Sequence, residues 1–292
     1  MCHIGNPPPQ PGKQPLNARN WLLGFGAATV LLLGVFWSGL IPSTPVQLQS
    51  FVKKLIIVVS VLYFAYLLFL AGLTTLERKR VVMMIALFLA CALFWSGFEQ
   101  AGSSFNLFAD RYTNRLIGSW EFPASWFQSM NSFYIIIFAP FFSAMWVRLG
   151  KRNLDPSSPT KFALGLMGMA LGFLIMAAAA RYVAAGSMVG VGWLTMVYLI
   201  HTFGELCLSP VGISAFSKLA PARMVGQSLG VWFTATALGN LIAAETAGEF
   251  DANNTAAMPG QMMHIFWFGL TSAVVLLVVG YLINRWIAAT KE

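Results

Sequence analysis

Charged side chains are scarce in this chain of 292 residues, because Asp, Glu, Lys and Arg make up only 10% of it. Soluble domains carry about 25% charged residues. Apolar residues account for 58% of the sequence, and the mean hydropathy is +0.70. So little polar surface cannot cover a soluble globular enzyme, and disordered chains have the opposite composition. We therefore predict an all-α polytopic membrane protein.

Cysteine is also rare. The chain has only Cys2, Cys91 and Cys207, and the last two lie in apolar runs, which excludes a scaffold held together by disulfides. No P-loop, paired-carboxylate pattern or nucleophile–base set occurs, and Ser209 lacks triad partners, so we predict neither an enzyme nor a metal site. The net charge of +8 would suggest nucleic-acid binding in a soluble protein. In a membrane protein, basic cytoplasmic loops explain it, so we predict no nucleic-acid partner.

Eight apolar runs are long enough to cross a bilayer, which takes about 20 residues. They cover residues 21–41, 55–75, 81–108, 125–148, 162–185, 188–219, 224–248 and 262–288. Strands are not predicted, because the chain lacks the alternating segments of about ten residues that build a transmembrane barrel. The Pro-rich residues 1–20 are expected to form a tail and do not resemble a signal peptide.

An even number of spans places both termini on the same side of the membrane. If that side is the cytoplasm, most of the 18 Lys and Arg residues fall in inside segments. This distribution follows the positive-inside rule. We therefore predict an integral protein of the cytoplasmic (inner) membrane with both termini in the cytoplasm.

Two acidic residues, Glu99 and Glu205, lie well inside predicted spans. A carboxylate at the bilayer centre costs about 3 kcal/mol on insertion scales, so such residues face a cavity, pair with a cation or carry protons. The alternative is a purely structural acid that stays paired or neutral. Small and polar residues surround both glutamates, and the segment around Glu205 also contains Pro210. Transporters place binding sites where Gly and Pro interrupt helices near the membrane midplane.

Two further polar positions inside the spans have two interpretations each, and one tryptophan stands apart from the others. Asn131 offers both a donor and an acceptor, which suits either a substrate contact or an interhelical hydrogen bond. His201 precedes Glu205 by one helical turn, where it is either a proton relay or a buried, hydrogen-bonded side chain. Trp232 shares its predicted helix with several polar residues, whereas we interpret the other tryptophans as interface anchors or packing.

Five segments in order along the chain carry a family resemblance. They are FWSGFEQAGSS at 94–104, QSMN at 128–131, PTKFALG at 159–165, GELCLSPVGIS at 204–214 and GVWFTATALGN at 230–240. Together they resemble the proton-dependent oligopeptide transporter family of the major facilitator superfamily. The resemblance covers nearly everything from Trp21 onward, and the segment at 204–214 is the most distinctive.

The resemblance implies twelve transmembrane helices in two bundles of six, with a two-helix hairpin between the bundles in many bacterial members. Residues 1–20 would then form a cytoplasmic tail or linker, 21–80 the hairpin and 81–292 the C-terminal bundle, which gives eight helices. The N-terminal bundle and its Glu-x-x-Glu-Arg-Phe motif do not occur in this sequence. We therefore expect either a fragment or a half that needs a partner bundle.

The resemblance also implies roles for single residues. It places Asn131, Glu205, Ser209 and Trp232 at the substrate, and Glu99, Glu205 and Asp110 in proton coupling or gating. Asn131 and Glu205 would hold the amino terminus of a peptide, and the peptide carboxylate would bind basic residues of the N-terminal bundle. Glu99 would pair with an arginine of that bundle, and Asp110 would form an extracellular gating pair with it. One departure is Ser132, where many members have proline.

The implied function is proton-coupled symport of di- and tripeptides by alternating access. The partners would be the peptide, protons, the lipid bilayer and the N-terminal bundle, and no cofactor is expected beyond the coupling proton. A non-transporting membrane remnant or interaction subunit is the first alternative. The second is a relative that moves nitrate or another small solute.

Overall fold

The computed structural model describes residues 44–248 and 251–290, together with residues 26, 27, 30, 34 and 38. The chain forms two compact units, Met1–Lys54 and Leu55–Glu292, and the boundary falls inside helix α2 (Pro45–Ala65). The predicted tail at 1–20 lies outside the described residues. So does the predicted first span at 21–41, apart from the isolated positions.

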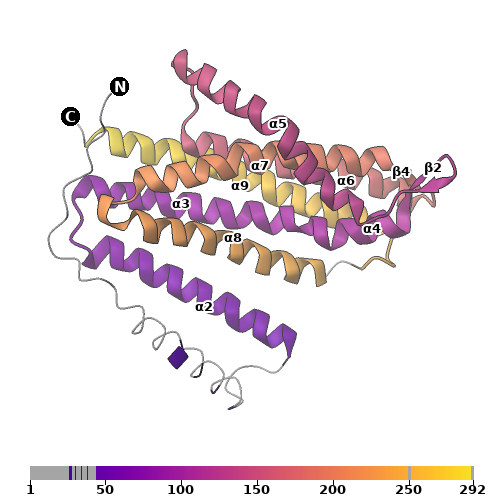
Figure 1. Ribbon diagram of the computed structural model, residues 1–292, viewed down its shortest axis with the longest axis horizontal. Coiled ribbons are helices and arrows are strands. Elements are labelled where there is room, and N and C mark those ends of the chain that lie inside the picture. Colours follow the sequence, from indigo (N-terminus) through magenta and orange to yellow (C-terminus); the bar gives the residue numbers. More distant parts are fainter. Residues whose placement is uncertain are drawn as a thin grey trace, which may run out of the picture. The chain divides into compact units, whose positions relative to one another are not determined.

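Long helices account for nearly all of the described chain (Figure 1). After α2 and its short π-helical extension η1 (Tyr66–Leu70) come α3 (Thr75–Phe98), the 3-10 turn η2 (Glu99–Gly102), α4 (Ser104–Tyr112), α5 (Trp126–Lys151), α6 (Ser158–Ala184), α7 (Val191–Leu219), the 3-10 turn η3 (Ala222–Met224), α8 (Val225–Gly248) and α9 (Met258–Ala288). Each predicted span after residue 41 corresponds to one of these helical stretches, so the predicted all-α polytopic fold is confirmed.

Six helical stretches of the described chain are long and apolar enough to cross a membrane. They are Pro45–Leu70, Thr75–Tyr112, Trp126–Lys151, Ser158–Ala184, Val191–Leu219 and Met258–Ala288. Helix α8 is not apolar enough to be counted among these six stretches, although it packs along α3 inside the second unit. A helix that contacts other helices needs less apolar surface than one surrounded by lipid.

Two helices begin several residues before the apolar runs that the sequence analysis gives as spans. The second span begins at Pro45 and not at residue 55, and the third begins at Thr75 and not at residue 81. At the second of these starts, the Thr74 hydroxyl accepts a hydrogen bond from the Glu77 backbone N–H, while the Glu77 carboxylate accepts one from the Thr74 N–H. This capping box satisfies two backbone donors at the helix end, so the charged residues 77–80 extend the helix instead of forming a loop.

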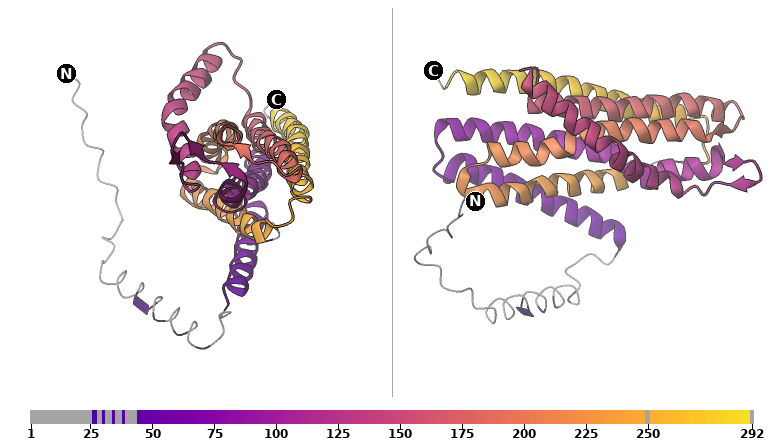
Figure 2. Two further views of the ribbon diagram at one scale, coloured as in Figure 1. Left: turned by 90° about the vertical axis from the view of Figure 1, so that its right-hand side faces the viewer. Right: turned by 45° about the horizontal axis from the view of Figure 1, so that its top comes forward.

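Helices α3, α6, α7, α8 and α9 run side by side, whereas α5 crosses them obliquely and packs mainly on α7 (Figures 1 and 2). Small residues allow a close approach between α6 and α7. A Cβ atom added at Gly204 would lie 2.8 Å from the Gly165 carbonyl oxygen, and one added at Gly165 would lie 2.9 Å from the Gly204 carbonyl oxygen. Such glycine pairs bring helix backbones together where hydrophobic collapse cannot.

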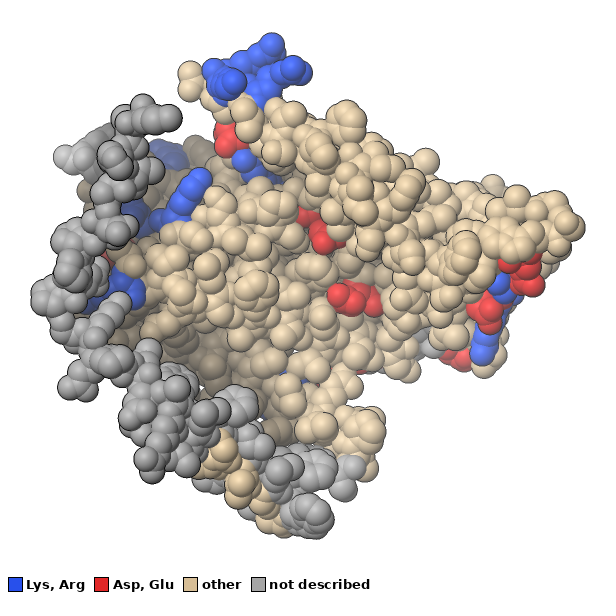
Figure 3. Space-filling model, in the orientation of Figure 1, with Lys and Arg blue, Asp and Glu red and all other residues tan. Residues whose placement is uncertain are grey.

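Side chains divide into a packed interior and an apolar exterior. The interior holds many fully buried aromatic rings, among them Phe94, Phe105, Phe162, Phe173 and Phe216. The exterior of α5 and α9 exposes large apolar side chains, as lipid contact requires. On the face shown in Figure 3, charged residues gather toward the two ends, and isolated acidic groups lie between them on an otherwise uncharged surface.

The strands in the described chain are only two residues long, and they belong to connecting segments. β1 (Thr113–Asn114) pairs in parallel with β4 (Val189–Gly190), and β2 (Leu116–Ile117) pairs antiparallel with β3 (Trp120–Glu121). These pairs lie at one end of the bundle (Figure 1). The β1–β4 pair ties the connection after α4 to the start of α7, whereas β2 and β3 form a hairpin within that connection.

Candidate functional site

The first component of the site is the break in the helical stretch that contains Glu99. Helix α3 ends at Phe98, the chain tightens into η2, and α4 starts at Ser104. Gln100 is almost fully buried and secures this break: its Nε2 donates to the Ala243 carbonyl of α8 at 3.1 Å, and its Oε1 accepts from the Ser104 hydroxyl at 2.8 Å. The small and polar residues in this segment thus allow the helix to tighten without leaving the Gln100 amide unpaired.

Glu99 itself is half-buried at the first position of η2. No hydrogen bond or ion pair to its carboxyl group is found within the part of the chain that the structure describes. The group is close enough to the Glu205 carboxyl group for their charges to interact. The two predicted intramembrane acids, one on η2 and one on α7, are therefore within electrostatic reach of each other, although no hydrogen bond joins them in the described part of the chain.

The second component links α5 to α7 through Asn131. The Asn131 Nδ2 donates to the Glu205 Oε2 at 2.9 Å and to the Thr202 Oγ1 at 3.1 Å. Thr202 is fully buried, and its own hydroxyl donates to the Tyr198 carbonyl at 2.7 Å. Asn131 and Glu205 are both half-buried. Both hydrogens of the amide nitrogen are thus used inside the protein, while the amide oxygen keeps its lone pairs.

Ser209 lies one turn after Glu205 on the same helix, so both side chains point to the same side of α7. The Ser209 Oγ is buried and has no hydrogen-bond partner among the described residues. Helix α7 continues through Pro210 to Leu219 as one α-helix. A hydroxyl without a partner next to a carboxylate is available to a polar ligand, which suits the predicted contact of Ser209 with substrate.

Trp232 lies in the interior of the bundle. Its indole ring is only 3% exposed and packs against Phe162 of α6 and Phe216 of α7, with ring centroids 5.9 and 5.4 Å away. A Cβ atom at Gly212 would lie 2.1 Å from the ring, so that glycine makes room for the indole. These contacts favour a packing role, and contact of Trp232 with substrate stays a prediction.

His201 is also an interior residue. Its ring is 2% exposed and contacts Phe98, Phe105 and Phe173, and its Nε2 lies 3.0 Å from the Met169 carbonyl oxygen of α6. Of the two interpretations from the sequence, the buried and hydrogen-bonded histidine fits this environment. A relay to Glu205 would need a polar path, and aromatic rings surround the imidazole instead.

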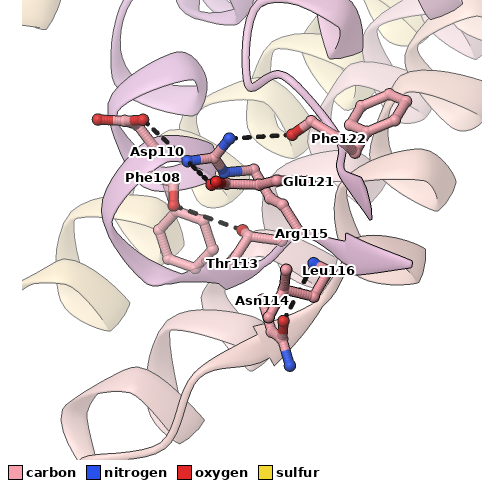
Figure 4. A network of polar contacts seen from close by, with 8 residues as sticks. All are labelled: Phe108, Asp110, Thr113, Asn114, Arg115, Leu116, Glu121 and Phe122. Carbon is pink, nitrogen blue, oxygen red and sulfur yellow. Dashed lines mark hydrogen bonds and ion pairs between the residues drawn. The ribbon is translucent and has the colours of Figure 1, made fainter. Parts of the chain in front are cut away.

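Asp110 is exposed near the end of α4, and its ion-pair partner, Arg115, lies in the segment that follows this helix (Figure 4). The Arg115 guanidinium contacts the Asp110 carboxylate at 3.1 Å and the Glu121 carboxylate at 2.9 Å. It also donates to the Phe122 carbonyl at 2.9 Å. This network holds the β2–β3 hairpin to α4, and a gating pair between Asp110 and another bundle stays a prediction.

The arrangement at Asn131 and Glu205 suits a cation with several N–H donors. A carboxylate oxygen and an amide oxygen offer acceptors to one ammonium group, and the Ser209 hydroxyl can add another. Metal binding has no comparable support, since no group of three or more His, Cys, Asp or Glu residues close enough to hold an ion occurs among the described residues. Sequence analysis missed Thr202, because a threonine in an apolar helix routinely donates to its own backbone and does not stand out in the sequence.

Sequence comparison matches residues 43–264 to the POT family. The chain belongs to this family. Among curated POT relatives, the peptide transporter YePEPT of Yersinia enterocolitica is 40% identical over 252 residues, which cover 86% of this chain and 49% of the relative. The uncharacterized transporter YclF of Bacillus subtilis is 35% identical over 78% of this chain and 45% of its own length. The chain thus spans about half the length of the curated relatives it matches.

Solved POT structures show the same fold. A peptide transporter POT in complex with sulfate is 33% identical, with a TM-score of 0.81 over 94% of this chain and 55% of the solved one. A POT family transporter in complex with 5-aminolevulinic acid is 26% identical, with a TM-score of 0.75 over 93% of this chain and 55% of the other. The family and the apolar helices together establish an integral membrane protein, and the match covers a C-terminal portion of the family fold.

Proposed function

We propose that this chain supplies the C-terminal half of a di- and tripeptide transport path, and that Asn131 and Glu205 bind the peptide amino terminus. The pair itself supports the proposal: an amide and a carboxylate from two different helices meet at 2.9 Å inside membrane-spanning segments. Burying a carboxylate there is expensive, and a bound ammonium would offset the cost. The 40% identity to a Yersinia peptide transporter adds support.

The proposal extends to the organisation of the chain in the membrane. Residues 1–20 would be a cytoplasmic tail or linker, 21–80 an inserted hairpin and 81–292 the C-terminal bundle, with both termini on the cytoplasmic side of the cell (inner) membrane. Transport would require an N-terminal bundle of the kind found in the family, in the same polypeptide or in a partner. That bundle would hold the peptide carboxylate, which the acids described here repel.

Proton coupling would use the two acids. With both carboxyl groups charged, Glu99 and Glu205 repel each other, and protonation of either removes the repulsion. A bound substrate ammonium does the same at Glu205. An inward proton gradient would then bias the exchange between outward- and inward-facing states, because protonation favours one of them. Glu99 has no cationic partner among the described residues and would pair with a cation of the N-terminal bundle.

The test is uptake of labelled Ala-Ala into proteoliposomes with an inward proton gradient. The chain is reconstituted alone and together with the N-terminal half of the Yersinia relative. We expect uptake in the second arm, loss of it with a protonophore, and at least a 100-fold loss with Glu205→Gln. Glu121→Gln makes the same chemical change at an exposed hairpin position and should keep uptake. Accumulation of Ala-Ala by Glu205→Gln at the wild-type rate would refute the proposal.

A second candidate function has a specific observation behind it. One POT relative of known structure binds 5-aminolevulinic acid, which also carries a free amine. The same Asn131–Glu205 pair would hold that amine. Competition for Ala-Ala uptake by 5-aminolevulinic acid and by nitrate separates the candidates, because nitrate has no ammonium for this site. Absence of any uptake in either arm would favour a non-transporting membrane protein.

A further inference from the structure

The buried hydroxyl of Thr202 is the starting point, because its hydrogen has only one destination. It donates to the Tyr198 carbonyl one turn earlier at 2.7 Å, and the side chain has no exposure to solvent. A hydroxyl that has given its hydrogen to a backbone carbonyl can only accept further hydrogen bonds. Thr202 is therefore a fixed acceptor that faces Asn131 of α5.

A fixed acceptor determines which way the Asn131 amide points. The amide nitrogen donates to the Thr202 Oγ1 at 3.1 Å and to the Glu205 Oε2 at 2.9 Å. With the amide turned by 180°, its oxygen would face the lone pairs of Thr202 and of the Glu205 carboxylate, and both hydrogen bonds would be lost. An unmade hydrogen bond at a buried polar group is more costly than the average bond is stabilising. The amide oxygen is consequently held away from Thr202 and left free to accept.

We propose that Thr202 is a positioning residue that orients the Asn131 amide and thereby makes the site selective for a free amino terminus. The inference rests on the proposed function, since it assigns the ammonium to the Asn131 oxygen and the Glu205 carboxylate. Without the Thr202 hydroxyl, the amide can turn and present its N–H groups outward. It would then repel an ammonium and accept the carbonyl of an acylated amino terminus.

Three variants in the transport-competent arm test this selectivity. Thr202→Val keeps the shape and removes the hydroxyl, Thr202→Ser restores the hydroxyl, and Thr195→Val is the matched control. Thr195 lies on the same helix and also donates to the carbonyl one turn earlier, at 2.9 Å, without a link to Asn131. We expect Thr202→Val to raise KM for Ala-Ala roughly 5- to 10-fold, which is the loss of about one hydrogen bond. Maximal uptake rate, Thr202→Ser and Thr195→Val should stay near wild type.

The acylated peptide supplies a readout that general loosening of the helix would not move in the same way. N-acetyl-Ala-Ala has no ammonium, so its inhibition constant against Ala-Ala uptake should stay constant or improve in Thr202→Val. If Thr202 only supported the fold, both ligands would weaken together. Equal weakening of both, or a Thr202→Ser variant as impaired as Thr202→Val, would overturn the inference.

A double-mutant cycle, measured by thermal unfolding of the purified chain, tests the same contact without a transport assay. Asn131→Ala and Thr202→Val should each lower the unfolding temperature, and the double variant should lose clearly less than the two losses combined. The pair Asn131→Ala and Thr195→Val should be additive. Additive losses for Asn131 and Thr202 would overturn the inference. Coupled losses together with no Ala-Ala uptake by the wild type would retain the Thr202 contact and refute the proposed function instead.

Discussion

Substitution of Gly172 by alanine tests the packing of α6 against α7 at the buried histidine. A Cβ atom at position 172 would lie 2.2 Å from both the Cδ2 and the Nε2 of His201. Non-bonded carbon atoms settle at about 3.5–4.0 Å, so the ring would have to move by more than about 1 Å. Phe98, Phe105 and Phe173 pack around the imidazole, which is itself only 2% exposed, so little room is left for the ring to move.

The cost has two components. Overpacking a well-filled interior costs about 1–3 kcal/mol, and displacement of the ring weakens its hydrogen bond to the Met169 carbonyl, which contributes about 1 kcal/mol. We therefore expect Gly172→Ala to destabilise the bundle by about 2–4 kcal/mol. This corresponds to a fall in the unfolding temperature of roughly 5–15 °C, on the scaling for domains of this size.

The assay is thermal unfolding of the purified protein in detergent, followed by tryptophan fluorescence. Gly192→Ala is the matched control, since a Cβ atom there meets nothing within 4 Å and the position is also helical. That variant should be neutral or slightly stabilising, because alanine favours helix more than glycine does. In a His201→Ala background, Gly172→Ala should cost little, because the ring is gone. An unchanged unfolding temperature for Gly172→Ala alone would refute the interior placement of His201.

Two smaller perturbations probe the ends of the bundle. Thr74→Ala removes the capping box with Glu77 and should cost about 1 kcal/mol, measured by the same unfolding assay, with Thr271→Ala on the exposed face of α9 as the control. Arg115→Leu removes one carbonyl contact and two ion pairs, in which the carboxylates are exposed and the guanidinium is mostly buried. Ion pairs with solvent-exposed partners contribute about 0–1 kcal/mol each, so global stability should change little. Hydrogen exchange should instead accelerate locally at residues 113–123, and Arg148→Leu should not produce this. Unchanged exchange there would contradict the role assigned to the guanidinium.

The general fold could be predicted because lipid imposes a simple rule on sequence. Every backbone polar group in the hydrocarbon must be paired within its own helix, so apolar runs of sufficient length indicate the spans. Helix starts at charged segments could not be predicted from hydropathy. The charged residues 77–80 lie between two predicted spans, yet Thr74 and Glu77 fit the capping-box pattern, which marks a helix start independently of hydropathy.

The site could be predicted only in part, for a different physical reason. A carboxylate such as Glu205 is conspicuous in an apolar span because of its cost. Thr202 carries no such signal, since a threonine in a transmembrane helix routinely bonds to its own backbone. Its significance depends on α5 crossing α7 at Asn131, and helix crossing is a property of packing. Interior polar residues such as His201 and aromatic ones such as Trp232 likewise reveal their environment only when α6 is in place.

The two intramembrane acids differ in surroundings, and this difference bears on their roles. Glu205 receives an N–H from Asn131, so a donor within the bundle stabilises its carboxylate form. Glu99 receives no such bond from the described residues, and its charge interacts with that of Glu205, which has the same sign. An acceptor that is already held in place is suited to bind a substrate ammonium in a fixed geometry. The repulsion acts on both acids, but only the Glu205 carboxylate has a donor within the described bundle, so we expect Glu99 to carry the coupling proton. We therefore expect Glu99→Gln to abolish the dependence of uptake on the proton gradient, while peptide exchange at equal pH persists. Glu205→Gln should abolish proton-driven uptake and peptide exchange alike. Loss of peptide exchange in Glu99→Gln as well would remove the distinction between the two acids.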